Sequence, residues 1–149
     1  MEEMEPRWEK LLQIRTTGRD DTNADQYRYP YELTPYCVLE RLAASGYISR
    51  KQVLVDYGCA EEFELPDNAD RFYFFNPFSI EILQKVMGKV RESYYRNPRE
   101  LVFFFYYPSS AYLAYLMTEN FLEFEDEIDC QDLFPGENSR ERIMIFKSQ

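Results

Sequence analysis

Residues 53–59 of this chain read VLVDYGC. The apolar, β-branched start and the glycine predict a short buried strand, Val53–Tyr57, that ends in a turn at Gly58. In α/β proteins, a turn of this kind forms a phosphate or nucleoside site only when more glycines follow, because the backbone must come close to the ligand. Residues 60–66 read AEEFELP and contain no glycine. The segment therefore predicts the first strand and turn of an α/β fold whose glycine loop is missing.

Predicted strands and helices alternate along the chain that follows. The next strands are Phe72–Phe75 and Leu101–Tyr107, and the second is apolar on both faces, as expected at the centre of a parallel sheet. Residues that cap or begin helices precede the apolar helical repeats: Thr34 as N-cap with Pro35 in the first helical position, Ser79, and Pro108-Ser109. The connection from Gly58 to Asp70 has about the dozen residues that a parallel crossover minimally requires.

The last third of the chain predicts an antiparallel pair. Phe121–Ile128 and Ile143–Phe146 both read as strands, and a loop joins them at one edge of the sheet. The whole pattern predicts an α/β fold with an open, mostly parallel sheet of about five strands and flanking helices. We expect residues 26–149 to form this domain and residues 1–25 to be an N-terminal helix with a polar linker.

Composition narrows the classes of function. The chain has 149 residues, of which 45% are hydrophobic, enough for one domain with a core. The net charge of −10 makes nucleic acid an unlikely partner, because such binding depends on neutralising phosphates. Histidine is absent, which excludes Ser-His-Asp and Cys-His sites and the HExxH zinc motif.

Localisation and metal binding follow from the same composition. The three cysteines form no CxxC pair, the first residues are acidic, and the longest apolar run is too short to span a bilayer. We therefore expect a cytoplasmic protein that does not enter a membrane. The acidic residues between Glu123 and Asp129 lack the spacing of an oxygen-ligand loop, so no metal site is expected.

Three segments together resemble class I S-adenosylmethionine-dependent methyltransferases. Tyr31–Pro35 and the following helix, residues 36–44, look like the Thr-Pro segment that precedes the first strand in amino-group methyltransferases. Val53–Cys59 resembles the start of the family's motif I, and Phe74–Phe78 (FFNPF) is similar to its Asn/Asp-Pro-Pro-Tyr/Phe motif. The predicted antiparallel strand pair at the C-terminal end also suits the family, and the resemblance covers roughly residues 29–147.

The resemblance implies a site and a reaction. It implies transfer of a methyl group from S-adenosylmethionine to an amine or similar acceptor, which the sequence does not name. The cofactor-binding residues would be Thr34, Pro35, Asp56 and Gly58. The catalytic residues would be Asn76 and Pro77, which accept hydrogen bonds from the acceptor nitrogen, and Phe78, which stacks on it.

The chain departs from the family in one large gap. It passes from the first glycine turn directly to the segment before motif IV, so the second and third strand–helix units, each of roughly 30 residues, are missing. The ribose-binding acid is lost with them. We therefore expect binding of S-adenosylmethionine to be weak or lost and the domain to be impaired or inactive. The alternative is a non-catalytic interaction protein, or a degenerate remnant, that forms a homodimer through the exposed edge of the first strand.

Overall fold

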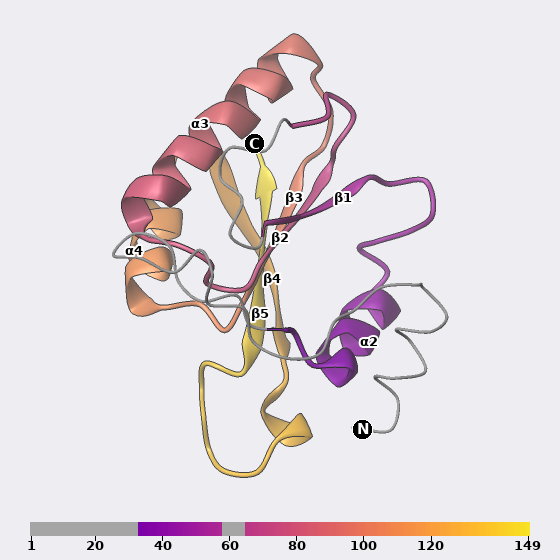
Figure 1. Ribbon diagram of the computed structural model, residues 1–149, viewed down its shortest axis with the longest axis vertical. Coiled ribbons are helices and arrows are strands. Elements are labelled where there is room, and N and C mark those ends of the chain that lie inside the picture. Colours follow the sequence, from indigo (N-terminus) through magenta and orange to yellow (C-terminus); the bar gives the residue numbers. More distant parts are fainter. Residues whose placement is uncertain (1–32, 58–64) are drawn as a thin grey trace.

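A computed structural model describes residues 33–57 and 65–149 of the chain (Figure 1). The helices in this part are α2 (Tyr36–Ala44), α3 (Ile80–Arg96), α4 (Ser110–Thr118) and the short 3₁₀ helix η1 (Gln131–Leu133). The strands are β1 (Leu54–Tyr57), β2 (Arg71–Phe74), β3 (Val102–Tyr106), β4 (Leu122–Asp129) and β5 (Arg142–Ser148). Each predicted strand and helix in this part of the chain is present, with ends that differ by one or two residues.

The five strands form one sheet in the order β1-β2-β3-β5-β4. Strands β1, β2 and β3 are parallel, and β5 runs antiparallel to both of its neighbours, β3 and β4. The predicted five-strand, mostly parallel sheet with an antiparallel pair at the C-terminal end is therefore confirmed. In the described part of the chain β1 is the edge strand on one side and β4 the edge strand on the other.

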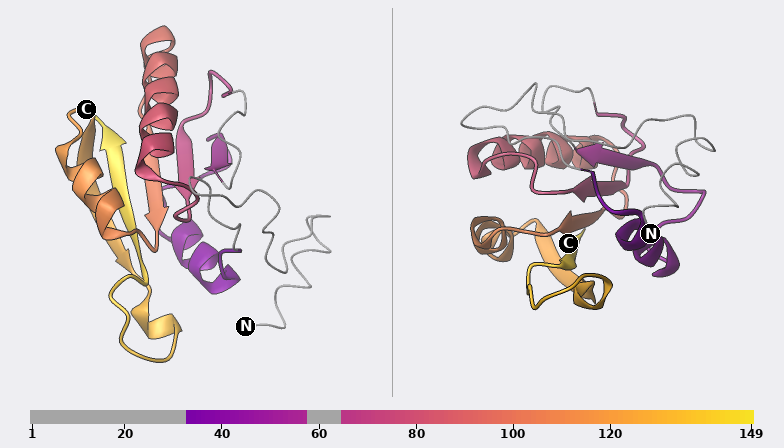
Figure 2. Two further views of the ribbon diagram at one scale, coloured as in Figure 1. Left: turned by 60° about the vertical axis from the view of Figure 1, so that its left-hand side comes forward. Right: turned by 60° about the horizontal axis from the view of Figure 1, so that its bottom comes forward.

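Helices cover both faces of the sheet, and each face has its own apolar core (Figure 2). Helices α3 and α4 bury Leu83, Met87 and Leu116 on one face, together with Phe74 and Phe105 of the strands. Helix α2 covers the other face through Val38 and Leu42, which pack in a cluster with residues of β2, β3 and β5. All five residues of β3 are buried, as its apolar sequence predicted.

The helix starts follow the predicted sequence signals with one exception. Ser79 and Ser109 are the N-cap residues of α3 and α4, and the Ser109 hydroxyl accepts a hydrogen bond from the Tyr112 N–H at 3.2 Å. The prediction that Thr34 caps α2 is wrong by one residue, because Pro35 occupies the N-cap position. The Thr34 hydroxyl instead forms a hydrogen bond with the Tyr73 hydroxyl at 2.5 Å, which ties this segment to β2.

Some sequence-based expectations lie outside the described residues. The N-terminal helix and linker, residues 1–25, and the turn residue Gly58 are among them. Within residues 33–57 and 65–149, no helix has the length and apolar character needed to cross a bilayer.

Candidate functional site

The predicted site residues gather at the carboxyl edge of the parallel strands. The carboxyl ends of β1, β2 and β3 share one edge because the strands are parallel, and ligands of open α/β sheets bind at this edge. Phe74 of β2 pairs with Phe105 of β3, so Asn76 and Tyr107, two residues further along each chain, lie at the same level. Asn76 and Tyr107 therefore lie at the edge where a ligand of such a sheet would bind.

Asn76 and Tyr107 share an uncommon backbone conformation. Their φ angles are +44° and +53°, and they are the only residues other than glycine with positive φ in the described part of the chain. A proline follows each of them, and a serine that starts a helix comes one or two residues later. The two strand-to-helix turns are thus close copies of each other, and both use a left-handed residue to turn the chain sharply.

Asn76 combines this backbone with an unused polar atom. Its side-chain Oδ1 is buried and accepts no hydrogen bond from the described residues. A buried acceptor without a partner is unfavourable, so native proteins seldom retain one. Because this oxygen is buried, an N–H group of a ligand can reach it only if the turn at Asn76 moves.

Tyr107 is held differently, by the loop that leads into β5. The Arg140 guanidinium lies 4.1 Å from the centre of its ring, and Arg140 donates a hydrogen bond to the Tyr107 carbonyl at 3.1 Å. The Tyr107 hydroxyl accepts a hydrogen bond from Asn138 Nδ2 at 2.7 Å. Phe75, next to Asn76, packs against Tyr107 with ring centres 6.4 Å apart. The loop therefore closes over the end of β3 and supports the Asn76 turn from one side.

Thr34 and Asp56 both come close to Tyr73. Thr34 is hydrogen bonded to the Tyr73 hydroxyl, and Asp56 pairs with Tyr73 in the register of β1 and β2. Paired residues of neighbouring strands point to the same face of the sheet, so Asp56 lies on the α2 face beside Tyr73. Pro35 begins α2 next to Thr34. Thr34 and Asp56, two of the predicted cofactor residues, thus both lie near Tyr73. Tyr73 precedes Asn76 by three residues.

The Asp56 carboxyl is both exposed to solvent and partly desolvated by nearby protein. Asp56 is exposed, yet nearby protein removes part of the hydration of its carboxyl and raises the pKa to about 6. Solvent still reaches this carboxylate and keeps it partly hydrated. The direction of the pKa shift nevertheless indicates an acid that has no cationic partner in the described part of the chain.

Pro77 and Phe78 are buried beneath the turn. Phe78 is fully buried in the core under α3 and α4, where its ring meets Phe74 edge-on at 6.3 Å. The Tyr112 hydroxyl donates a hydrogen bond to the Phe78 carbonyl. A planar substrate therefore cannot reach the Phe78 ring in this conformation. Of the three residues of the predicted acceptor motif, only Asn76 is partly exposed, and its buried Oδ1 has no hydrogen-bond partner in the described part of the chain.

A buried tyrosine lies beside this edge and was not predicted as a site residue. The Tyr106 hydroxyl donates to Glu141 Oε2 at 2.5 Å, and burial together with this carboxylate raises the pKa of Tyr106 far above its ordinary value. Tyr106 is 2% exposed, so it acts as a brace between β3 and the start of β5 rather than as a ligand contact.

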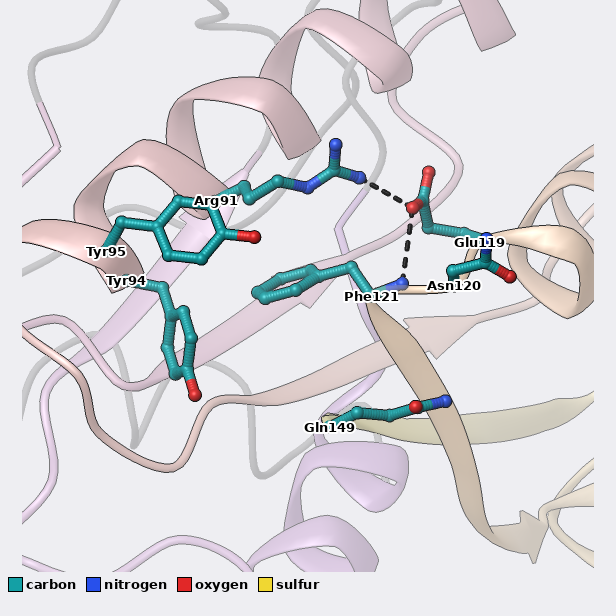
Figure 3. A pocket seen from close by; sticks show the side chains of 7 residues that line it. All are labelled: Arg91, Tyr94, Tyr95, Glu119, Asn120, Phe121 and Gln149. Atoms are coloured by element: carbon teal, nitrogen blue, oxygen red, sulfur yellow. Dashed lines mark hydrogen bonds and ion pairs between the residues drawn. The ribbon is translucent and has the colours of Figure 1, made fainter.

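A surface pocket lies elsewhere, near the amino ends of the parallel strands (Figure 3). Arg91, Tyr94 and Tyr95 of α3 line it together with Glu119, Asn120, Phe121 and Gln149. Gln149 donates its backbone N–H to the Phe121 carbonyl, and Ser148 donates to Leu101 just before β3 begins. The pocket is thus at the amino end of β3, and none of the predicted site residues lines it.

Comparisons of the chain with protein-family models, curated proteins and solved structures find no match. Any functional assignment must therefore rest on the residues themselves. The residues that sequence reasoning missed at the carboxyl edge are Tyr73, Tyr107 and Arg140. The Tyr107-Pro108-Ser109 sequence was the available signal, because it repeats the strand–proline–serine pattern of residues 76–79. Among residues 33–57 and 65–149, no group of three or more metal-ligating side chains is close enough to hold an ion.

Proposed function

We propose that this chain is a shortened domain of the class I S-adenosylmethionine-dependent methyltransferase type that retains the acceptor side of the site. The observation that carries the proposal is the buried, unpaired Oδ1 of Asn76 at the carboxyl end of β2. When the turn opens to a ligand, this oxygen accepts a hydrogen bond from an N–H group of a bound amine or amide. Such a bond orients the nitrogen lone pair, which is what methyl transfer to nitrogen requires of the protein.

The strand order supports the proposal. The sequence resemblance implies that loss of the second and third strand–helix units leaves five adjacent strands, with the first strand at the new edge. The observed order, β1-β2-β3-β5-β4 with β5 reversed, is compatible with that expectation. The proximity of Thr34 and Asp56 to Tyr73 supports it as well, because both were assigned to the same ligand.

The cofactor side is less complete. β1 ends the sheet in the described part of the chain, and no strand in that part pairs with its outer side to carry a ribose-binding acid. Asp56 alone, exposed and without a cationic partner there, cannot enclose an adenosyl group. The residues present therefore do not form a full site for S-adenosylmethionine, and we assign no methyl-transfer step to them. Binding of the cofactor is expected to be weak or lost.

Two titrations test the proposal. S-adenosylhomocysteine is titrated into the purified chain by calorimetry, and a flat trace is expected; saturable binding at micromolar concentration would show that the cofactor site is intact. Acetamide and methylammonium are then added to a ¹⁵N-labelled sample. Either probe is expected to shift the Asn76 side-chain amide signals more than those of Asn97, whose amide donates to the Asp67 carbonyl at 3.0 Å. Equal shifts at both residues would refute an acceptor site at Asn76.

A second candidate function is self-association through β1. The two edge strands differ: β4 carries five carboxylates and an irregular register between Phe124 and Asp126, whereas β1 carries one carboxylate, Asp56, and an exposed Leu54. Charges and bulges on an edge strand oppose pairing with another chain, and an apolar edge favours it. The β1 edge is thus the better candidate for joining two copies of the chain into a larger sheet.

The oligomeric state tests this second candidate. We expect a concentration-dependent dimer by analytical ultracentrifugation, and Leu54→Lys should abolish it because it places two like charges at the shared edge. Phe124→Lys is the matched control on the other edge, since Phe124 is also about half exposed, at 45% against 46% for Leu54. A monomer at all concentrations, or a dimer that only Phe124→Lys disrupts, would rule out the β1 interface.

A further inference from the structure

The pocket at the amino end of β3 combines aromatic walls with a balanced charge. Tyr94 and Tyr95 come from the last part of α3, and Phe121 precedes β4, so segments far apart in the sequence supply the three rings. The pocket has a volume of about 520 Å³. This volume lies within the range of about 300–1,000 Å³ that is usual for small-molecule sites.

The three rings pack edge to face, and Tyr95 is the most exposed of them. Tyr94 meets Tyr95 at an interplanar angle of 61° and Phe121 at 67°, with ring centres 5.7 and 5.4 Å apart. Rings at such steep angles do not stack face to face on one another. Tyr95 is 69% exposed, the largest exposure of any large hydrophobic side chain in the described part of the chain. Figure 3 shows the three rings near one another, with Asn120 next to Glu119 on the other side of the Phe121 backbone and Gln149 below it.

The charged side chains of the pocket neutralise each other. Arg91 and Glu119 are the only lining residues with charged side chains, and Arg91 Nη2 lies 2.6 Å from Glu119 Oε1. Glu119 also accepts hydrogen bonds from the Phe121 N–H at 3.3 Å and from the Tyr115 hydroxyl at 3.2 Å. Both oxygens of its carboxylate therefore have hydrogen-bond partners, and the guanidinium of Arg91 lies 5.4 Å from the centre of the Phe121 ring.

These features select among ligand classes. A cationic ligand would bind best over an aromatic ring, but the positively charged Arg91 already lies over the Phe121 ring and would repel it. Both carboxylate oxygens of Glu119 already have partners, so Glu119 offers little attraction to a cation. A phosphate would find no unpaired cation among the lining residues, in a chain whose net charge is −10. A planar, uncharged ligand can stack on the tyrosines and beside the guanidinium of Arg91, whose side chain is 36% exposed.

We propose that the pocket formed by Arg91, Tyr94, Tyr95 and Phe121 binds an uncharged planar heteroaromatic compound of the nucleobase or nucleoside class. The rings supply the stacking surface. The side-chain amide of Asn120 and the side-chain oxygen of Gln149, whose Nε2 donates to the Leu122 carbonyl at 3.1 Å, supply hydrogen-bonding groups for the edge of the base. This site is separate from the carboxyl edge discussed above and does not depend on the function proposed there.

A ligand-observed NMR titration with adenosine tests the inference. Adenosine is expected to bind saturably, and Tyr95→Ala is expected to weaken binding about fivefold or more, since base–aromatic stacking contributes roughly 1–3 kcal/mol per base. Met117→Ala is the control, because Met117 is also well exposed, at 58%, and does not line the pocket. This control should leave the affinity unchanged.

Further probes distinguish the other outcomes. Adenosine 5′-monophosphate should bind no more tightly than adenosine, and choline should not bind. Tighter binding of the monophosphate, saturable binding of choline, or no saturation by adenosine would each overturn the inference. A loss of adenosine binding on Asp56→Asn but not on Tyr95→Ala would place the nucleoside at the carboxyl edge and overturn it too. The same two variants also assign any heat seen with S-adenosylhomocysteine to one site or the other.

Discussion

Replacement of Asn76 by glycine should stabilise the protein. The native residue has a φ angle of +44° and a buried Oδ1 without a hydrogen-bond partner in the described part of the chain. Removal of such an acceptor relieves a desolvation penalty of about 1–3 kcal/mol. Glycine adopts the left-handed region without strain but costs about 0.5–1 kcal/mol of chain entropy. The net expectation for Asn76→Gly is a gain of about 1 kcal/mol in the free energy of unfolding.

The assay compares thermal and chemical unfolding of the two proteins under the same conditions. For a domain of this size, 1 kcal/mol corresponds to an increase in Tm of about 2–4 °C. Asn68→Gly is the matched control, because Asn68 is an exposed turn residue and does not have positive φ. This control should lower stability by about 0.5–1 kcal/mol, which isolates the entropy cost of glycine.

The result that would refute this reasoning is a loss of stability in Asn76→Gly equal to or larger than that in Asn68→Gly. Such a loss would mean that the Asn76 side chain makes favourable interactions in the native state, and that its oxygen is not available for a ligand. A gain in stability together with a loss of the response to acetamide and methylammonium would support a residue kept for binding at the expense of stability.

Three further predictions concern neighbouring residues. Phe78→Ala should lower the free energy of unfolding by about 3–5 kcal/mol in chemical denaturation, because the ring is fully buried; a loss below about 1 kcal/mol would mean that the ring is not part of the core. The Asp56 pKa is raised from its ordinary 3.8 to about 6, so the folded state binds a proton more tightly than the unfolded state, and stability should fall as pH rises from about 4 to 6. Asp56→Asn should remove this part of the pH dependence and be more stable than the native protein at pH 7 but not at pH 3.5; identical pH profiles would contradict the shift. Tyr106→Phe, which removes the donor to Glu141, should cost about 1–2 kcal/mol in urea unfolding, and an unchanged midpoint would show that this hydrogen bond adds nothing.

Local sequence signals were sufficient for most of the secondary structure. The apolar runs predicted β2 and β3, and Ser79 and Ser109 marked the N-caps of α3 and α4. The same type of signal failed at Thr34, whose hydroxyl bonds to Tyr73, 39 residues away, instead of capping α2. A cap rule weighs only neighbours along the chain, so it cannot detect a competing partner on another strand.

Local sequence signals also found only part of the candidate site. The Asn-Pro sequence after β2 pointed to Asn76, but the sequence could not show that the Phe78 ring is fully buried or that the Asn76 Oδ1 is buried without a partner in the described part of the chain. The pocket of Arg91, Tyr95 and Phe121 gave no sequence signal, because its parts are up to 30 residues apart and meet only when α3 packs beside the start of β4.

The sequence by itself determined the alternation of strands and helices, the antiparallel pair at the end and the absence of a glycine loop, because periodicity and turn residues act over a few neighbours. Only the tertiary structure decided which polar atoms lack partners, which rings face solvent and which strands form the edges. Those properties depend on contacts between segments far apart in the chain. The buried oxygen of Asn76 and the exposed ring of Tyr95, on which the two site proposals rest, are both of this second kind.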